Sequence, residues 1–141
     1  MRSVKWIIMI SLFSMIAACQ FSGTELIKPY ATDGCSSFPE GTRQHRDLWH
    51  KCCTEHDQKY WVGGSYDERL SADRELRSCV QSVGEPAIAE LMLAGVRVGG
   101  SPWWPSSFRW GYGWPYTHGY RALTPDELEQ VRKQKEGQGD K

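Results

Sequence analysis

The residues of this chain that are best suited to chemistry lie close together, within the stretch 49–60. Read as a helix of about 3.6 residues per turn, this stretch has two neighbouring faces that carry reactive side chains. One face holds Cys52, His56 and Tyr60, and the next holds Cys53 and Asp57. A histidine so placed can act as a general base, and an aspartate can bind a metal ion. Adjacent cysteines cannot easily bond to each other inside a helix, so each is expected to join this helix to a different segment.

The helix that follows must supply a partner for His56. A short connection makes the two helices antiparallel neighbours. Asp73 precedes Cys79 by six residues, and His56 follows Cys52 by four. If a disulfide joins Cys52 to Cys79, the Asp73 carboxylate can therefore bond one ring nitrogen of His56 and leave the other free as a base. Tyr60, one turn beyond His56, can donate its hydroxyl to the same carboxylate.

The loop 32–41 is expected to lie beside Asp57. It is dense in turn residues and carries Cys35, so the helix geometry favours a disulfide between Cys35 and Cys53. The main-chain carbonyls of such a loop, next to an aspartate, are hard oxygen ligands that suit Ca²⁺. A base beside a bound cation can activate water while the cation stabilises an oxyanion, and these are the two requirements of ester hydrolysis.

The Cys-Cys-x-x-His-Asp string at 52–57 and the Asp-x5-Cys string at 73–79 resemble the catalytic core of the secreted phospholipase A2 superfamily. The resemblance covers residues 33–80, and the small number of cysteines is similar to that of the bacterial members. It implies calcium-dependent hydrolysis of the sn-2 ester of a phospholipid substrate, and the same two disulfides. The catalytic roles that it implies are general base for His56, orienting partner of that base for Asp73, and support of that partner for Tyr60.

The resemblance also implies a calcium site. Asp57 would be a bidentate ligand, and the main-chain carbonyls of Gly34, Ser36 and Phe38 would complete the site. The loop departs from the family's Cys-Gly-x-Gly pattern, because Ser36 and Phe38 stand where the family has glycine. This departure keeps a second interpretation open, in which the chain is a non-catalytic phospholipase A2-like lipoprotein that binds lipid or a protein partner of the cell envelope.

Three further interpretations concern the same side chains. The set of Cys52, Cys53, His56 and Asp57 could bind zinc, although an exported chain favours disulfides and the Cys-x2-Cys spacing of zinc knuckles is missing. The histidine and its carboxylates could form a buried, satisfied pair between packed helices. The same pair could also hydrolyse a different ester. The sequence indicates no particular head group, acyl chain or protein partner.

The first residues, 1–18, are predicted to be a signal peptide. Two basic residues precede an apolar run at 6–16, which is shorter than the roughly 20 residues that span a bilayer. The run ends in Ile-Ala-Ala-Cys, which resembles the lipobox of bacterial lipoproteins and implies a lipid anchor on Cys19. Gln20 is not the aspartate associated with inner-membrane retention. We therefore predict a chain exported to the cell envelope and anchored there, in the outer membrane or facing the periplasm; an ordinary signal cut nearby is the alternative.

Charge and cysteine content narrow the possible functions and indicate how the chain is cross-linked. The whole chain has 17 basic and 17 acidic residues, and removal of residues 1–18 would leave a net charge of −2. Such a chain has no basic excess of the kind that nucleic-acid binding requires. Four cysteines remain after Cys19, and an even number in an exported chain predicts two disulfides.

The predicted fold is all-α, with a tether at 19–31 and a phospholipase A2-like domain at 32–123. A weak signal allows a short helix at 24–27. Three core helices are expected: one beginning between Thr42 and Asp47 and ending at Gly63-Gly64, one from a capping box of Ser65 and Glu68 to about Ser82, and one from Pro86 to Gly99-Gly100.

The C-terminal part is expected to be irregular. Prolines and glycines interrupt an aromatic-rich segment at 101–120, within which 110–114 could form a short strand. This segment is interpreted either as a small satellite core or as a surface that contacts membrane or substrate. A capping box with proline at its first helical position then predicts a short helix and a charged tail at 124–141.

Overall fold

The computed structural model describes residues 26–139, and these residues form four α-helices and no strand. The helices are α1 (His50–Val62), α2 (Tyr66–Ser82), α3 (Pro86–Gly99) and α4 (Pro125–Gly139). The predicted all-α class is confirmed. The predicted signal peptide, the lipid anchor on Cys19 and most of the tether lie outside the described residues. Nowhere between residues 26 and 139 is a helix both long enough and apolar enough to cross a membrane.

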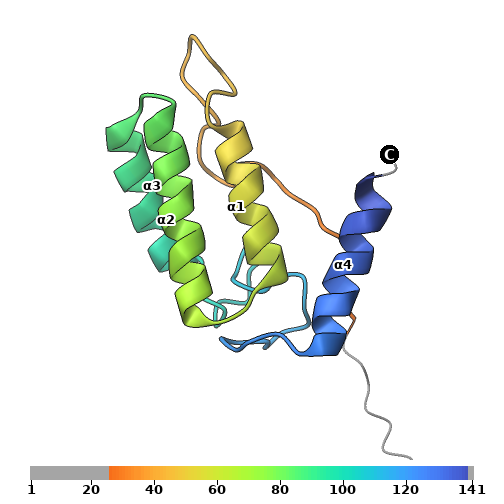
Figure 1. Cartoon of the computed structure of the whole chain (residues 1–141). Coiled ribbons are helices and arrows are strands. Elements are labelled where there is room, and N and C mark those ends of the chain that lie inside the picture. The colour runs from red at the N-terminus through yellow and green to blue at the C-terminus, as the bar shows by residue number, and fades with distance from the viewer. Residues whose placement is uncertain (1–25, 140–141) are drawn as a thin grey trace, which may run out of the picture.

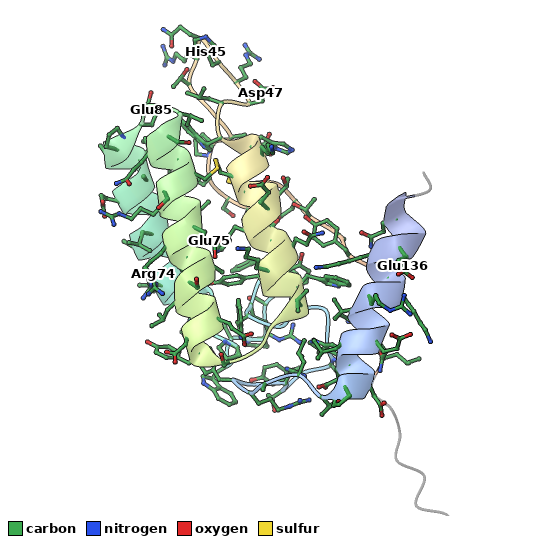
Figure 2. The ribbon with its side chains drawn as sticks, viewed as in Figure 1. His45, Asp47, Arg74, Glu75, Glu85 and Glu136 are labelled. Atoms are coloured by element: carbon green, nitrogen blue, oxygen red, sulfur yellow. A yellow bond between two sulfur atoms is a disulfide. The ribbon has the colours of Figure 1, made fainter. Side chains whose placement is uncertain are left out.

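The first three helices lie side by side, and each runs antiparallel to the one before it (Figure 1). Helix α2 packs against both α1 and α3, whereas α4 stands on the far side of α1 (Figure 1). Charged side chains such as Arg74 of α2 and Glu136 of α4 point away from the molecule (Figure 2). The antiparallel arrangement of α1 and α2 agrees with the prediction made from their short connection.

Glycines and a capping box set the junction between α1 and α2. Gly63 and Gly64 have φ values of 73° and 133°, which are backbone conformations that favour glycine and end α1. The Ser65 side chain accepts from the Glu68 main-chain N–H, and the Glu68 carboxylate accepts from the Ser65 N–H at 2.7 Å. Both features agree with the prediction, because each depends on residues close together in sequence.

The start of α1 differs from the prediction, since the helix begins at His50 rather than between residues 42 and 47. Residues before it form turns instead. The Trp49 N–H donates to Glu40 O at 3.0 Å, and the Trp49 indole donates to Pro39 O at 2.6 Å. These bonds fold the 39–49 segment back on itself, so its main-chain groups are satisfied without a helix.

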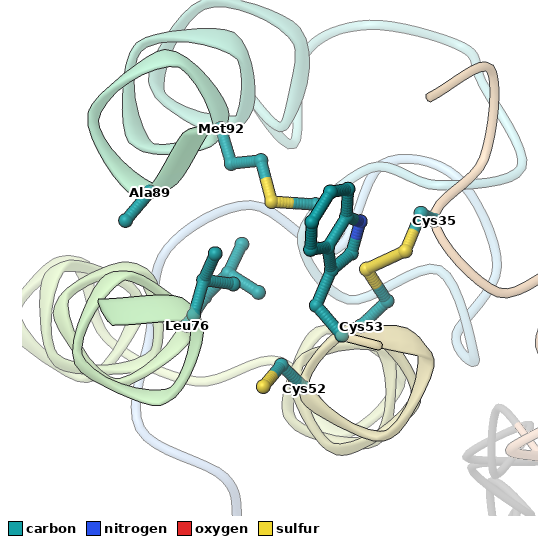
Figure 3. Packing of buried hydrophobic residues seen from close by; sticks show 8 residues of the cluster. Cys35, Cys52, Cys53, Leu76, Ala89 and Met92 are labelled. Atoms are coloured by element: carbon teal, nitrogen blue, oxygen red, sulfur yellow. A yellow bond between two sulfur atoms is a disulfide. The ribbon is translucent and has the colours of Figure 1, made fainter. Parts of the chain in front are cut away.

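Two disulfides stand in the largest core cluster. Cys35 is bonded to Cys53, and Cys52 is bonded to Cys79, as the helix geometry favoured. Around them pack buried apolar side chains from all three adjacent helices (Figure 3). The buried members of this cluster are Cys35, Trp49, Cys52, Cys53, Leu76, Val80, Ala89 and Met92, and the partly buried Cys79 packs against them. Because burial of apolar surface is the main favourable term in folding, this cluster fixes how α1, α2 and α3 sit together.

The aromatic-rich segment caps the C-terminal end of α1. The short strand that the sequence allowed at 110–114 is not formed, and the segment forms turns instead. The last carbonyl groups of a helix lack partners within it, and here the indole of Trp114 donates to Val62 O at 2.7 Å. Main-chain N–H groups of Gly111 and Gly113 donate to the carbonyls of the two residues before Val62, at 2.7 and 3.1 Å. These long-range bonds replace the ladder that a strand would have made.

Helix α4 is longer than predicted, because it includes residues that were expected to form a charged tail. Its first turn has the expected capping box of Thr124 and Glu127. Farther along, Arg132 forms ion pairs with Glu129 and Glu136 at helical spacing, which supports the exposed turns. The 24–27 helix is not formed in its described part, since residues 26 and 27 have no regular secondary structure.

Candidate active site

His56 and Asp73 are in contact across the α1–α2 interface. His56 Nε2 lies 3.0 Å from Asp73 Oδ1. Both residues are buried, with exposed fractions of 7% and 0%. The Cys52–Cys79 disulfide joins the same two helices and sets their register, as the spacing of the four residues predicted. No described residue bonds the other ring nitrogen, Nδ1, so this nitrogen can accept a proton if Nε2 holds its own hydrogen toward the carboxylate.

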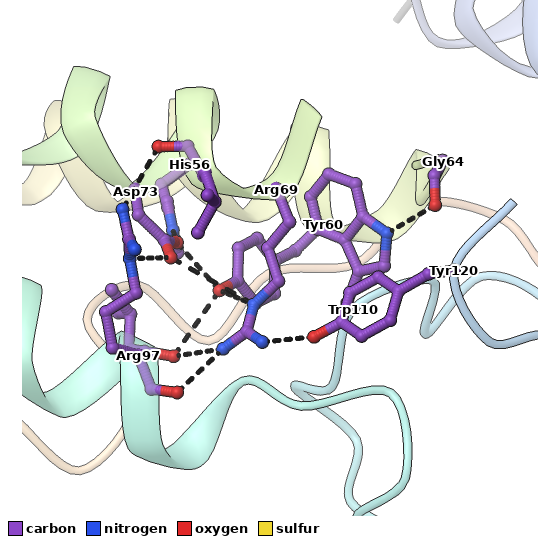
Figure 4. A network of polar contacts seen from close by, with 10 residues as sticks. His56, Tyr60, Gly64, Arg69, Asp73, Arg97, Trp110 and Tyr120 are labelled. Carbon is purple, nitrogen blue, oxygen red and sulfur yellow. Dashed lines mark hydrogen bonds and ion pairs between the residues drawn. The ribbon is translucent and has the colours of Figure 1, made fainter. Parts of the chain in front are cut away.

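Tyr60 supports the carboxylate as expected. Its hydroxyl donates to Asp73 Oδ1 at 2.7 Å and accepts from the Arg69 Nε–H at 3.0 Å (Figure 4). Burial, followed by the negative charge of Asp73, raises the pKa of the Tyr60 phenol. The phenol therefore stays protonated, which is the form that can donate to a carboxylate.

Two arginines near Asp73 were missed from the sequence. Arg97 Nε lies 2.7 Å from Asp73 Oδ2, and Arg69 Nε lies 4.0 Å from the same oxygen. Arg69 also donates to the carbonyls of Val96 and Arg97 at 2.8 and 2.9 Å, which ties α2 to the end of α3 (Figure 4). The spacing of Arg69 four residues before Asp73 was a usable signal. Arg97 had none, because it reaches the site only through the packing of α3.

Asp57 points away from this pair, toward the loop that precedes α1. Its Oδ2 accepts from the Thr32 hydroxyl at 2.6 Å. Burial raises the pKa of the Asp57 carboxyl to about 6, against the opposing effect of that hydrogen bond. A carboxylate that is partly removed from water is stabilised by a bound cation.

The loop 34–38 lies next to Asp57, held to α1 by the Cys35–Cys53 disulfide. Gly34 and Ser36 both have left-handed backbone, with φ values of 71° and 55°. Ser36 thus takes the conformation that favours glycine, at a position where the resembled family has glycine. Among the described residues, no donor bonds the carbonyl oxygens of Gly34, Ser36 or Phe38, so these three oxygens are available as hard ligands.

A metal site made only of side chains is not formed here. The described part of the chain has no group of three or more His, Cys, Asp or Glu side chains that could hold a metal ion. The zinc interpretation of Cys52, Cys53, His56 and Asp57 is wrong, because both cysteines are consumed in disulfides. A cation at Asp57 would therefore rely on main-chain oxygens.

A cavity of about 380 Å³ opens onto these groups. Its polar wall contains His56, Asp57, Tyr60 and the 34–38 loop. The rest is mainly apolar, with Leu76, Leu91, Met92, Val96 and Phe108 among its lining residues. Asp73 is not part of the lining, so a ligand in the cavity can meet His56 while the carboxylate stays behind it.

Comparisons of the chain with family models, with curated proteins and with solved structures give no match. The geometry is thus the ground for a functional proposal. It brings together every predicted catalytic and metal-ligating residue around one cavity, with Asp73 directly behind its wall.

Proposed function

We propose that this chain is a calcium-dependent, phospholipase A2-like hydrolase that cleaves the sn-2 ester of phospholipids. The observation that carries the proposal is the composition of the first cavity. It is lined by His56, which bonds Asp73, by Asp57 and by the loop 34–38, and the rest of its lining is mainly apolar. Ester hydrolysis needs a base for water, and a lipid substrate needs an apolar channel for its acyl chains. Both are present within one site.

The chain's own groups supply the proton transfer. Asp73 accepts the Nε2 hydrogen of His56, which leaves Nδ1 as the base that takes a proton from water. The water then attacks the ester carbonyl, and the same nitrogen returns its proton to the leaving alcohol. Asp73 holds the tautomer and the ring orientation, while Tyr60 holds Asp73. The products are a lysophospholipid and a free fatty acid.

The residues fit the calcium ion that this reaction calls for. Asp57 would hold it together with the carbonyl oxygens of Gly34, Ser36 and Phe38, which lack other partners among the described residues. When bound, calcium would supply positive charge close to the ester carbonyl, where negative charge develops. The Cys35–Cys53 disulfide holds the loop and α1 together, so the ligands are kept close without the ion.

Fatty-acid release from defined phospholipids tests the proposal. We expect release from the sn-2 position in calcium, loss of release in chelator, and loss in both His56→Gln and Asp57→Asn. His45→Gln is the matched control, because His45 is exposed in the 39–49 segment and should leave activity unchanged. A folded protein with both disulfides that releases no fatty acid from any phospholipid would contradict the hydrolase.

A second candidate is the non-catalytic lipid-binding module. It is favoured by one observation, that the Thr32 hydroxyl already bonds an Asp57 carboxylate oxygen at 2.6 Å and so competes with a cation for it. Calcium titration by calorimetry separates the two candidates. Binding at or below millimolar calcium supports the hydrolase, whereas no binding together with retained affinity for phospholipid vesicles supports the module.

A further inference from the structure

A second cavity, of about 330 Å³, adjoins the first one. Asp57 and Phe108 line both cavities, so the two meet at these side chains. The walls of the second differ in chemistry, because four charged side chains line it: Lys28, Asp33, Asp57 and Arg109. A ligand whose ester lies at His56 can therefore extend past Asp57 into a charged compartment.

Arg109 is the distinctive feature of this compartment. It is 92% buried, since its exposed fraction is only 8%. Two of its nitrogens donate to the carbonyls of Ser106 and Trp114, at 3.2 and 2.6 Å, and its buried Nε has no partner. Within residues 26–139 no carboxylate forms an ion pair with it. Burial lowers the pKa of the guanidinium, as expected for a buried cation that forms no ion pair.

Lys28 adds a second cation, on a segment that is held firmly in place. Its main-chain N–H donates to Gly113 O at 2.8 Å, and its carbonyl accepts from the Trp61 indole at 2.8 Å. Farther along, the Tyr112 hydroxyl donates to Ala31 O at 2.6 Å. The side chain of Lys28 is exposed and has no ion pair among the described residues. Hydrogen bonds within the chain therefore hold this wall of the cavity in place.

We propose that the second cavity binds the phosphate of the phospholipid head group, with Arg109 and Lys28 as its anion-binding residues. A buried, unpaired guanidinium is strongly stabilised by an oxyanion, and Arg is well suited to phosphate. Asp33 and Asp57 also line this cavity, but neither forms an ion pair with Lys28 or Arg109 among the described residues. A calcium ion on Asp57 would add further positive charge beside these two cations. The identity of the ligand rests on the proposed function, because the first cavity must hold the acyl ester for the phosphate to lie here.

Calorimetric titration of the full chain in detergent tests this site apart from catalysis. The probe is dihexanoyl phosphatidylglycerol in calcium, with dihexanoylglycerol as the phosphate-free comparison, and all proteins carry His56→Gln so that nothing is hydrolysed. Arg109→Gln should weaken binding of the phosphatidylglycerol roughly tenfold, since a hydrogen bond to a charged group is lost. Lys28→Gln should weaken it less, and neither variant should change binding of dihexanoylglycerol.

Lys51→Gln is the charge-matched control, because Lys51 is an exposed residue of α1 outside both cavities. Arg109→Gln could lose its fold together with its two carbonyl contacts, so Lys28→Gln, which keeps its main-chain bonds, decides in that case. Equal affinity of Lys28→Gln and Lys51→Gln for phosphatidylglycerol would overturn the proposal. So would inorganic phosphate that binds as tightly as the lipid, which would indicate a site for free phosphate.

The outcome is independent of hydrolysis. If the chain with His56 intact releases no fatty acid, yet Arg109→Gln and Lys28→Gln still weaken phosphate-dependent binding, the head-group site stands and the hydrolase does not. If release occurs and both variants bind like the control, the hydrolase stands and the head-group site does not.

Discussion

At the scale of single residues, Asp73 connects three helices. It lies on α2. Its Oδ1 contacts His56 and Tyr60 of α1, and its Oδ2 lies next to the guanidinium of Arg97 of α3. An unpaired carboxylate at this depth would be strongly disfavoured, so the arginine and the two donors together make its burial tolerable. The histidine is oriented by a group that is itself held from three sides.

Removal of the Tyr60 hydroxyl tests this support. Tyr60→Phe takes one donor from Asp73 and leaves the Nε of Arg69 without an acceptor. We expect the free energy of unfolding to fall by about 1–3 kcal/mol, and hydrolysis to fall by about tenfold while His56 stays in place. Chemical denaturation and the rate of fatty-acid release measure the two effects. Tyr66→Phe is the control, since Tyr66 is half exposed at the start of α2; an equal loss in both variants would contradict a specific role.

The raised pKa of Asp57 predicts a pH dependence of stability. In the folded chain this pKa is about 6, above the ordinary value of 3.8, so the folded state binds the proton more tightly. The contribution of the Asp57 carboxyl to the stability of the fold is therefore greatest below about pH 3.8 and is lost as the pH rises through about 6. Chemical denaturation in chelator across this window should show a steeper decline with pH for the parent chain than for Asp57→Asn. Identical slopes would contradict a buried, cation-free carboxylate.

At the scale of elements, the two disulfides perform separate tasks. Cys52–Cys79 joins α1 to α2 and so sets the register of His56 against Asp73. Cys35–Cys53 instead joins α1 to the loop 34–38, which lines the first cavity together with Asp57. Because the cysteines are adjacent on α1, one helix serves as the common reference for both the base and the proposed cation site.

Replacement of each pair by serine should separate these tasks. Either double variant should lose about 3–4 kcal/mol of unfolding free energy, from the loop length that each disulfide closes. Cys35→Ser with Cys53→Ser should weaken calcium binding most, whereas Cys52→Ser with Cys79→Ser should lower the hydrolytic rate at saturating calcium most. Calorimetry and initial rates, measured well below each midpoint of unfolding, distinguish them. The same pattern of losses in both variants would contradict the division.

At the scale of the whole molecule, apolar side chains gather near the opening of the first cavity. Leu91 and Phe108 line the cavity and are 57% and 44% exposed. In the aromatic-rich segment that carries Phe108, Trp103 and Trp104 are each 57% exposed. Trp is favoured at the boundary between lipid and water, and a lipid substrate must leave its bilayer to reach His56. The segment thus has two parts, with buried indoles that cap α1 and exposed ones that are available for a membrane.

Binding to vesicles tests the exposed part. Trp103→Ala with Trp104→Ala should lower the affinity for phospholipid vesicles about tenfold, because burial of the indole rings drives binding to the membrane. Activity on monomeric short-chain lipid should stay near that of the parent, since this substrate requires no membrane binding. Leu128→Ala is the control, since Leu128 is 55% exposed on α4. Sedimentation with vesicles gives the affinity. A loss of activity on monomeric lipid equal to the loss of vesicle binding would indicate a role in the site and not at the membrane.

The sequence by itself determined the parts that depend on local spacing. Helical periodicity, the paired glycines and the capping box predicted the α1–α2 pair, and the positions of four cysteines relative to His56 and Asp73 predicted both disulfides and the dyad contact. These features could be predicted because a regular helix converts sequence separation directly into position on a face. The proposed lipid anchor on Cys19 remains a prediction of the same local kind.

Only the tertiary structure decided the rest. Arg97 reaches Asp73 because α3 packs on α2, and Arg109 lines a cavity formed by segments far apart in sequence. The short strand that the sequence allowed at 110–114 is not formed, because this segment satisfies the free carbonyls of α1. Helix α1 begins later than predicted, because Trp49 folds the preceding loop back. Periodicity carries no information about which distant segment will satisfy a helix end or a buried charge. That choice follows from the packing of the complete chain.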